Sequence, residues 1–266
     1  TMAGSPQSNK DFLEWITNEF ELGKLVVKES WSDSNPFRRY KVKIREEIVT
    51  LGKPEVLPLE TSDTHLSPEQ WHQALQDEGV LVLDTRNSYE TKVGKFKQAM
   101  YPDIEEFHEF PEYLKNAGIP KDKKVLIYCT GGIRCEKAIV EMHNQGFTNV
   151  FQLDGGILNY IEKYPNQEFD GECFVFDHRV ALDQNLEPSK KFKMCPHCGQ
   201  PADNVVTCPR CDSPATVCED CLNSEHLHTC SKDCAYHYSR NRLIKGPQNQ
   251  SGYRASLLQE QTQSEA

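Results

Sequence analysis

The sequence predicts an α/β fold in which a parallel sheet carries helices on both faces. Short apolar runs alternate with amphipathic segments over residues 80–163, a pattern that is typical of parallel sheets. Asp84, Cys129 and Asp154 each stand where a predicted strand ends, which is the edge where such sheets carry their chemistry. A chain of 266 residues with 37% hydrophobic residues is long enough for two or three domains.

Residues 1–60 predict part of an α/β unit. Residues 9–20 place apolar side chains at near-helical spacing, and residues 24–30 and 39–51 alternate like half-buried strands. One helix with two or three strands is too little for an independent core, so we expect part of this domain to be absent from the chain. Residues 53–70, rich in proline and polar residues, are expected to form a linker.

The central region predicts alternating helices and strands. A helix begins at Pro68 with Ser67 as its cap. Residues 80–84, 124–129 and 149–153 are apolar runs that predict buried strands. Helices are expected over residues 104–118, where Pro111 interrupts the helix, from near Cys135 to Gly146, and over residues 155–164.

The charge pattern argues against a protein that coats nucleic acid without specificity. The formal net charge is −10, and the positive charge is local, with five cations in residues 38–45. The alternative interpretation of this basic run is a solvent-exposed edge strand or a linker with no role in binding. As an RNA-contacting surface, it offers the side chains of Arg38, Arg39, Lys41 and Lys43.

Nothing in the sequence indicates a membrane or a secretory route. No apolar run approaches the roughly 18 residues needed to span a bilayer, and the first ten residues do not look like a signal peptide. We therefore expect a cytoplasmic protein in a reducing compartment, where closely spaced cysteines are metal ligands before they are disulfides.

The segment from Cys129 onward predicts an anion-binding loop with a nucleophile at its rim. After the buried strand, two glycines let several backbone N–H groups converge, and the positive end of the next helix faces the same point. These dipoles and the charge of Arg134 favour a thiolate at Cys129. The structural alternative is a small core residue at a strand end. The loop consists of Thr130, Gly131, Gly132, Ile133, Arg134 and Cys135.

Two further residues are candidates for this site. Cys135 has the helical spacing of a core residue, or it is a resolving thiol that forms a disulfide with Cys129. Arg86 is expected to be a third catalytic residue beside Cys129 and Arg134, with the alternative that Arg86 and Glu90 pair with each other.

Four stretches carry a resemblance to a known family. Residues 68–165, with the loop CTGGIR, resemble a rhodanese domain, in which four residues separate the cysteine from the arginine. The stretches YCTGGIRCEKA, PDIEEFHEFPEY, KIREEIVTLG and GECFVFDHRVALD resemble the bacterial tRNA uridine-34 hydroxylase family. The resemblance implies a ferredoxin-like α+β domain before the rhodanese domain, here lacking its first half. It also implies oxygen-dependent conversion of uridine 34 to 5-hydroxyuridine in tRNA, with Cys129 required and no organic cofactor.

Residues 195–234 predict a zinc module. Three C-x2-C units and one C-x3-C unit supply eight thiolates, enough for about two structural Zn²⁺ ions. We favour sequential pairing of the units, because the first two share the form CPxC; interleaved pairing is the alternative. His197, His226 and His228 are expected to be surface residues. The predicted ligands are Cys195, Cys198, Cys208, Cys211, Cys218, Cys221, Cys230 and Cys234.

Five regions follow from these patterns. They are a partial ferredoxin-like domain (1–57), a rhodanese domain (66–168), a connector (169–192), a zinc module (193–238) and a tail expected to be disordered (239–266). Two other functions compete with tRNA hydroxylation: sulfur transfer from thiosulfate or a persulfide donor through a Cys129 persulfide, and a non-catalytic interaction module.

Overall fold

A computed structural model describes residues 2–23, 25, 27–32, 35–37, 41–58 and 63–240 of the chain. Its largest unit is built around a five-stranded sheet with the strand order β1-β6-β5-β2-β4. All four neighbouring pairs of strands run parallel. The strands are β1 (His65–Leu66), β2 (Leu81–Asp84), β4 (Ala99–Met100), β5 (Val125–Tyr128) and β6 (Val150–Leu153).

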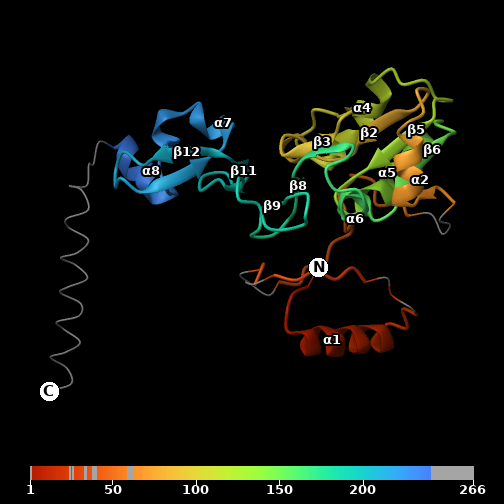
Figure 1. Cartoon of the computed structure of the whole chain (residues 1–266), viewed down its shortest axis with the longest axis horizontal. Coiled ribbons are helices and arrows are strands. Elements are labelled where there is room, and N and C mark those ends of the chain that lie inside the picture. Colours follow the sequence, from red (N-terminus) through yellow and green to blue (C-terminus); the bar gives the residue numbers. More distant parts are fainter. Residues whose placement is uncertain are drawn as a thin grey trace.

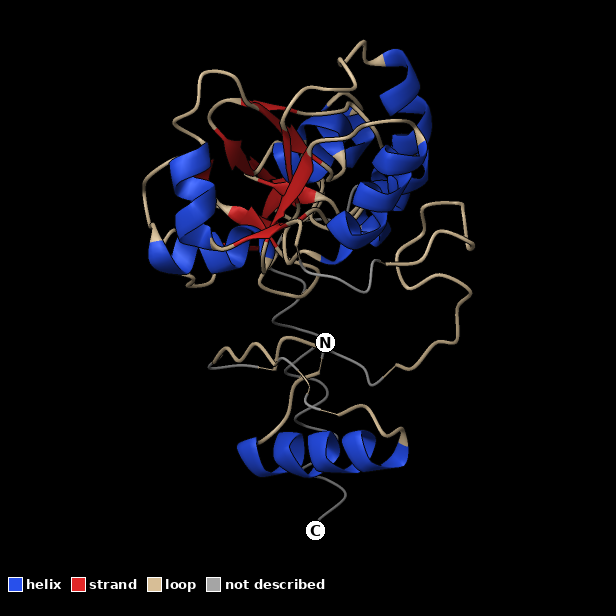
Figure 2. Cartoon of the chain, turned by 90° about the vertical axis from the view of Figure 1, so that its right-hand side faces the viewer, coloured by secondary structure: helices blue, strands red, loops and turns tan. Residues whose placement is uncertain are grey.

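Helices cover both faces of this sheet, as predicted (Figures 1 and 2). The side chains of β5 alternate between two cores: Val125 and Ile127 face one, whereas Leu126 and Tyr128 face the other. The first core includes α4 (Phe110–Asn116) and α5 (Ile133–Asn144), and the second includes α2 (Pro68–Ala74) and α6 (Gly156–Lys163). The predicted α/β class with a two-sided parallel sheet is therefore confirmed.

The element boundaries differ from the predictions in two places. The helix expected over residues 104–118 is shorter, because Pro111 lies in the first turn of α4 rather than inside a longer helix, and a 3₁₀ turn, η1 (Phe107–Glu109), precedes it. The predicted linker contains the edge strand β1, which pairs with β6. A two-residue strand is too short to show any alternation in the sequence.

The N-terminal region contains a helix, α1 (Pro6–Glu19), that buries no residue. The strands predicted over residues 24–30 and 39–51 are wrong for the described residues, none of which lies in a strand before His65. A strand needs the backbone hydrogen bonds of a neighbour, and an alternating pattern alone cannot supply them. Val42 and Ile44, apolar residues of the second of these segments, are exposed.

The last part of this region packs on α5 of the sheet unit. Leu51 and Val56 are buried in the first core. Glu47 pairs with the buried amine of Lys137 and accepts the backbone N–H groups of Leu51 and Gly52. Residues 47–56 are thus held against the helix that follows the Cys129 loop.

Short elements connect the sheet unit to the cysteine-rich module. They are β7 (Phe169–Gly171), β8 (Cys173–Phe174) and β9 (Ala181–Leu182), of which β8 and β9 pair antiparallel. β7 pairs antiparallel with β3 (Gly94–Phe96), which follows α3 (Ser88–Thr91) inside the sheet unit. The module itself, blue in Figure 1, contains β10 (Lys193–Met194), β11 (Pro201–Ala202), β12 (Asn204–Thr207), β13 (Pro214–Val217), α7 (Glu219–Leu222), η2 (Glu225–Leu227) and α8 (Lys232–Ser239). The tail predicted to be disordered lies, from residue 241 on, outside the described residues.

Among the helices that the structure describes, none combines the length and the hydrophobicity that crossing a bilayer requires.

Gly156 brings the start of α6 into close contact with the Cys129 loop. Its φ is +68°, and a Cβ added there would lie 2.5 Å from the Cys129 carbonyl oxygen and 2.7 Å from the Gly132 nitrogen. Real Cβ atoms do not approach the backbone so closely, so only glycine allows this contact. Gly118 has a similar φ of +64° with nothing within 4 Å of an added Cβ.

This pair of glycines allows a matched test of the contact. We expect Gly156→Ala to lower the free energy of unfolding by at least about 2 kcal/mol more than Gly118→Ala, because both variants hold an alanine at a left-handed φ but only Gly156→Ala adds steric overlap. Chemical denaturation of the two variants measures the difference. Equal destabilisation would contradict the proposed close packing of α6 on the loop.

Candidate functional site

Cys129 lies directly after β5, at the carboxyl edge of the sheet. The chain then turns through Gly132, whose φ of +92° is left-handed and which caps α5. The backbone N–H of Gly132 points back and donates a hydrogen bond to Cys129 Sγ at 3.1 Å. The loop therefore curls around the sulfur, as the glycine pair predicted.

The sulfur of Cys129 is an anion near neutral pH. Its burial acts to raise the pKa, but the Cys135 thiol donates a hydrogen bond, Arg134 supplies positive charge, and the backbone N–H groups of both residues point at the sulfur. Together these interactions lower the pKa of Cys129 to about 6. At pH 7 roughly nine-tenths of the molecules would then carry the thiolate.

Cys135 keeps its proton and supports this charge. Burial and the hydrogen bond to Cys129 raise the pKa of Cys135 well above its usual value. Its Sγ also lies 3.7 Å from Thr85 Oγ1. The two thiols of the site therefore have opposite roles, one as the anion and the other as the hydrogen-bond donor.

A buried ion pair fixes Arg134 beside the loop. Its guanidinium makes two hydrogen bonds, of 2.5 and 2.7 Å, to the carboxylate of Glu90 in α3. Glu90 is fully buried and also accepts a hydrogen bond from Thr130 Oγ1 at 3.3 Å. Because the paired carboxylate leaves Arg134 little freedom, its positive charge stays at a fixed place near the sulfur.

Arg86 follows β2 rather than lying in the Cys129 loop, and its catalytic role stays a prediction. Its guanidinium is completely buried and binds the carboxylate of Asp84 at 2.7 Å and the carbonyl oxygen of Gly94 at 2.6 Å. Nor does it pair with Glu90, the alternative considered from the sequence, because Arg134 occupies that carboxylate. Arg86 and Asp84 are only two residues apart, so each satisfies the other's buried charge locally.

The structure adds Lys28 to the site, which the sequence did not indicate. Its amine donates a hydrogen bond of 2.7 Å to the carbonyl oxygen of Gly155, next to the loop. Burial lowers its pKa, while the charges of Asp154 and Cys129 act to raise it. Lys28 and Gly155 are 127 positions apart, so their contact leaves no local signal in the sequence. Glu90 did attract notice in the sequence, but as a possible partner of Arg86 rather than of Arg134.

Lys41 and Lys43, two of the candidate RNA-contacting residues, lie on an irregular segment. Lys41 and Lys43 are exposed, and the charges of Lys41 and Arg45 lower the pKa of Lys43. Arg38 and Arg39 lie outside the described residues.

The eight cysteines of the module form two groups of four. Cys195, Cys198, Cys218 and Cys221 form the first, and Cys208, Cys211, Cys230 and Cys234 form the second. Within each group the sulfur atoms all lie within 4.8 Å of one another. Hydrogen-bonded pairs are 3.4 to 3.8 Å apart, close to the roughly 3.8 Å that tetrahedral bonds of about 2.3 Å to zinc would give. The thiols of each group therefore fit one tetrahedral metal ion.

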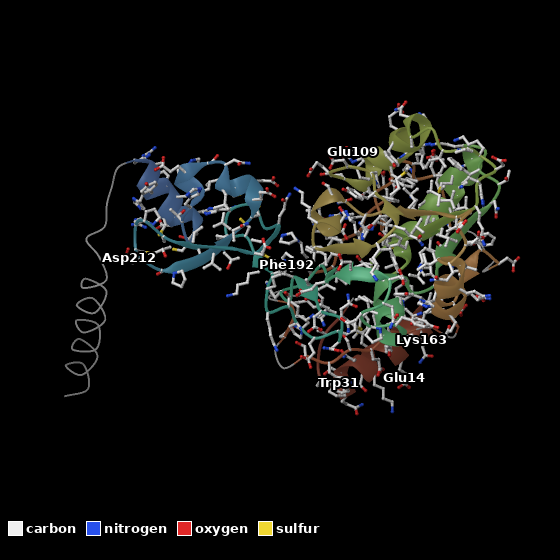
Figure 3. The ribbon with its side chains drawn as sticks, turned by 45° about the horizontal axis from the view of Figure 1, so that its top comes forward. Glu14, Trp31, Glu109, Lys163, Phe192 and Asp212 are labelled. Atoms are coloured by element: carbon white, nitrogen blue, oxygen red, sulfur yellow. The ribbon has the colours of Figure 1, made fainter. Side chains whose placement is uncertain are left out.

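The grouping is interleaved, so the preference for sequential pairing was wrong. The second C-x2-C unit lies at the turn between β12 and β13, and Figure 3 marks this turn with Asp212, far from Phe192. A four-residue strand separates this turn from the first unit by roughly 13 Å. β13 runs antiparallel to β12, so the third C-x2-C unit, which follows β13, lies beside the first unit.

His197 is buried rather than on the surface, contrary to expectation. Its Nε2 lies 2.8 Å from the carbonyl oxygen of Thr229, and it belongs to neither group of thiols. It links the loop of the first C-x2-C unit to the segment before α8. Arg210 is placed similarly beside the second group, since it donates to Cys234 Sγ at 3.4 Å and binds Asp233.

We expect labelling of Cys129 by iodoacetamide to rise with pH around a midpoint near 6. Cys135→Ala should raise this midpoint by about one to two units, because a hydrogen bond to the charged sulfur is lost, and Cys135→Ser should raise it less. Mass spectrometry of the Cys129 peptide from about pH 4 to about pH 9 measures the midpoint. Cys173→Ala, which changes another buried cysteine, is the control, and a wild-type midpoint above about 8 would contradict the arrangement.

Three family models match parts of the chain. A rhodanese-like domain matches residues 67–163, a rhodanase C-terminal region matches residues 170–235, and a UPF0176 acylphosphatase-like domain matches residues 1–48. The rhodanese-like fold predicted from the sequence is thereby confirmed.

Curated relatives match over most of the chain. A protein of Bdellovibrio bacteriovorus named tRNA uridine(34) hydroxylase is 56% identical over 75% of this chain and 57% of its own length. Proteins of the same name from Legionella pneumophila (strain Paris) and Synechocystis are 49% and 44% identical, over 74% and 73% of their own lengths and 70% and 76% of this chain. The chain thus spans little more than half of the first relative and about three quarters of the other two. At this identity and coverage, the chain belongs to the tRNA uridine(34) hydroxylase family.

Proposed function

We propose that this protein hydroxylates uridine 34 of tRNA to 5-hydroxyuridine, with Cys129 as the reactive group. The observation that carries the proposal is the thiolate of Cys129, held in a loop of N–H groups and beside Arg134. Its relatives at 44 to 56% identity carry the name of this activity. A stabilised sulfur anion at a sheet edge is a nucleophile, which a binding module would not need.

The nucleophile would act by adding to C6 of the uracil ring. As the bond from Cys129 Sγ to C6 forms, the electron pair of the C5=C6 bond moves to C5 and its neighbouring carbonyl. C5 then becomes electron-rich and takes an oxygen atom from an oxidant. Departure of the thiolate and of the C5 proton restores the double bond.

Molecular oxygen is the proposed oxidant. One of its atoms would enter at C5, and the other would leave as water after taking up two protons and two electrons from an external reductant. The chain's own residues supply the nucleophile and the positive surroundings that keep it charged. In this proposal Cys135, the hydrogen-bond donor to Cys129, would form a disulfide with it after oxidation of the sulfur.

The chain divides, in this proposal, into the five regions expected from the sequence: 1–57, 66–168, 169–192, 193–238 and 239–266. The exposed amines of Lys41 and Lys43, with Arg38 and Arg39, would bind phosphates of the tRNA backbone. A tRNA substrate and reduced thiols both fit a cytoplasmic protein.

Two structural zinc ions are proposed for the cysteine-rich module. Their ligands are the two interleaved groups of four thiols. Zinc would supply folding free energy to a small unit whose strands are short. Arg210, through its hydrogen bond to Cys234, would partly neutralise the charge of the second site.

Sulfur transfer is the second candidate function. The loop places four residues between Cys129 and Arg134, and the small ring of N–H groups that results suits a terminal persulfide sulfur. The Cys129 thiolate would attack the outer sulfur of thiosulfate, break its S–S bond and release sulfite. An acceptor thiolate would then attack the outer sulfur of the Cys129 persulfide, which gives an acceptor persulfide and releases the Cys129 thiolate.

Replacement of Cys129 separates these functions from a purely structural role. We expect tRNA incubated with Cys129→Ser to contain at least about a hundred-fold less 5-hydroxyuridine than tRNA incubated with the wild type, because the hydroxyl is not an anion at neutral pH. Nucleoside mass spectrometry measures the product, and Cys173→Ser is the matched control. Cyanide-dependent turnover of thiosulfate by the wild type, without any 5-hydroxyuridine, would favour sulfur transfer instead.

Paired substitutions test the interleaved zinc sites. We expect about two zinc ions per chain, and about one in the double variant Cys195→Ser with Cys218→Ser, because both ligands belong to one group. The double variant Cys195→Ser with Cys208→Ser should lose both ions, since it damages both groups. Elemental analysis of the purified proteins counts the ions. The reverse pattern would indicate sequential pairing.

A further inference from the structure

Two large apolar side chains remain exposed at the rim of the Cys129 loop. Ile133, the first residue of α5, is 62% exposed, and Phe176, which follows β8, is 64% exposed. Cys129 itself is only 2% exposed. Any substrate that approaches the sulfur must therefore pass a rim in which apolar surface is unusually prominent.

The ring of Phe176 is tied to the loop from two sides. It meets Phe174 edge to face, with ring centres 5.0 Å apart, and the carbonyl oxygen of Phe174 accepts a hydrogen bond from Thr130 Oγ1. On the other side, the guanidinium carbon of Arg134 lies 5.6 Å from the centre of the Phe176 ring. Thr130 and Arg134 both belong to the loop that surrounds Cys129, so the ring is tied to the loop that holds the reactive sulfur.

The chemistry of this rim suits a flat, uncharged ring. A base that leaves the stack of an RNA loop loses stacking energy and needs a new apolar surface, which aromatic side chains and guanidinium planes commonly provide. A thiosulfate ion is charged and gains nothing from an exposed aromatic ring. The aromatic wall therefore favours a nucleobase over a small sulfur anion as the group that enters the site.

We propose that Phe176, supported by Ile133, forms the wall against which the target pyrimidine base packs when it presents its C5–C6 edge to Cys129. This inference rests on the proposed function, because it names the residues that bind the base on which Cys129 acts. Phe176 is thus a residue that binds the base. Arg134 has two roles: its charge stabilises the thiolate of Cys129, and its guanidinium supports the ring of Phe176.

Binding of RNA tests the wall without requiring turnover. The probe is an unmodified anticodon stem–loop with uridine at position 34, compared with the same RNA lacking only that base. Wild-type protein should bind the uridine form about ten-fold more tightly, within the range of roughly 1 to 3 kcal/mol known for stacking of one base on an aromatic residue. Phe176→Ala should lose this preference, and Phe176→Tyr should keep it.

Two controls separate the wall from a structural role. Tyr101→Ala removes another exposed ring of the same unit, whose cation partner is Lys95 rather than a loop residue, and it should leave the preference unchanged. The pH midpoint of Cys129 labelling should stay near 6 in Phe176→Ala, because the N–H groups, Cys135 and Arg134 remain.

The results distinguish the proposed aromatic wall from the proposed hydroxylation activity. A preference for uridine that survives in Phe176→Ala, or one that is missing from the wild type, overturns the wall. A shifted labelling midpoint in Phe176→Ala also overturns it, since the ring would then act through the loop. If wild-type protein prefers uridine, Phe176→Ala does not, and no 5-hydroxyuridine forms, the wall stands and the proposed hydroxylation fails.

Discussion

The buried ion pair of Glu90 and Arg134 is the interaction on which the reactive site depends. Two charges removed from water are tolerated only when each is well paired, and here the guanidinium makes two short hydrogen bonds to one carboxylate. That carboxylate also receives the hydroxyl of Thr130, so one side chain from α3 fixes both ends of the loop. The positive charge of Arg134, which acts with the Cys135 hydrogen bond to keep Cys129 ionised, is thus held in place by a carboxylate on another element.

The same pair connects the site to its surroundings. Arg134 contacts the ring of Phe176, and Thr130 bonds to the backbone of Phe174, so the segment after β8 is positioned by the loop that it borders. From the opposite direction, Lys28 reaches Gly155, and Glu47 binds Lys137 on α5. Residues from before and after the sheet unit therefore meet at one edge of the sheet, where Cys129 lies.

Local patterns in the sequence were sufficient for the three central strands of the sheet and for the loop, because each depends on neighbours in the chain, but not for the two-residue edge strands β1 and β4. The apolar runs that became β2, β5 and β6 and the glycines after Cys129 are such patterns. Contacts between distant residues were not visible: the Arg134–Glu90 pair spans 44 positions, and Arg86 found a nearer partner in Asp84. The spacing of the cysteines identified the ligands but not their grouping, since the grouping follows from a hairpin whose length the spacing does not encode.

The interleaved arrangement of the cysteines has a consequence for how the chain acquires its structure during synthesis on the ribosome. With sequential pairing, the first four thiols would be complete at residue 211 and could close while the rest was still being made. In the observed arrangement, the first set is complete only at Cys221 and the second only at Cys234. The first two C-x2-C units therefore cannot complete a set of four thiols with each other, and each must wait for a partner unit that is made later.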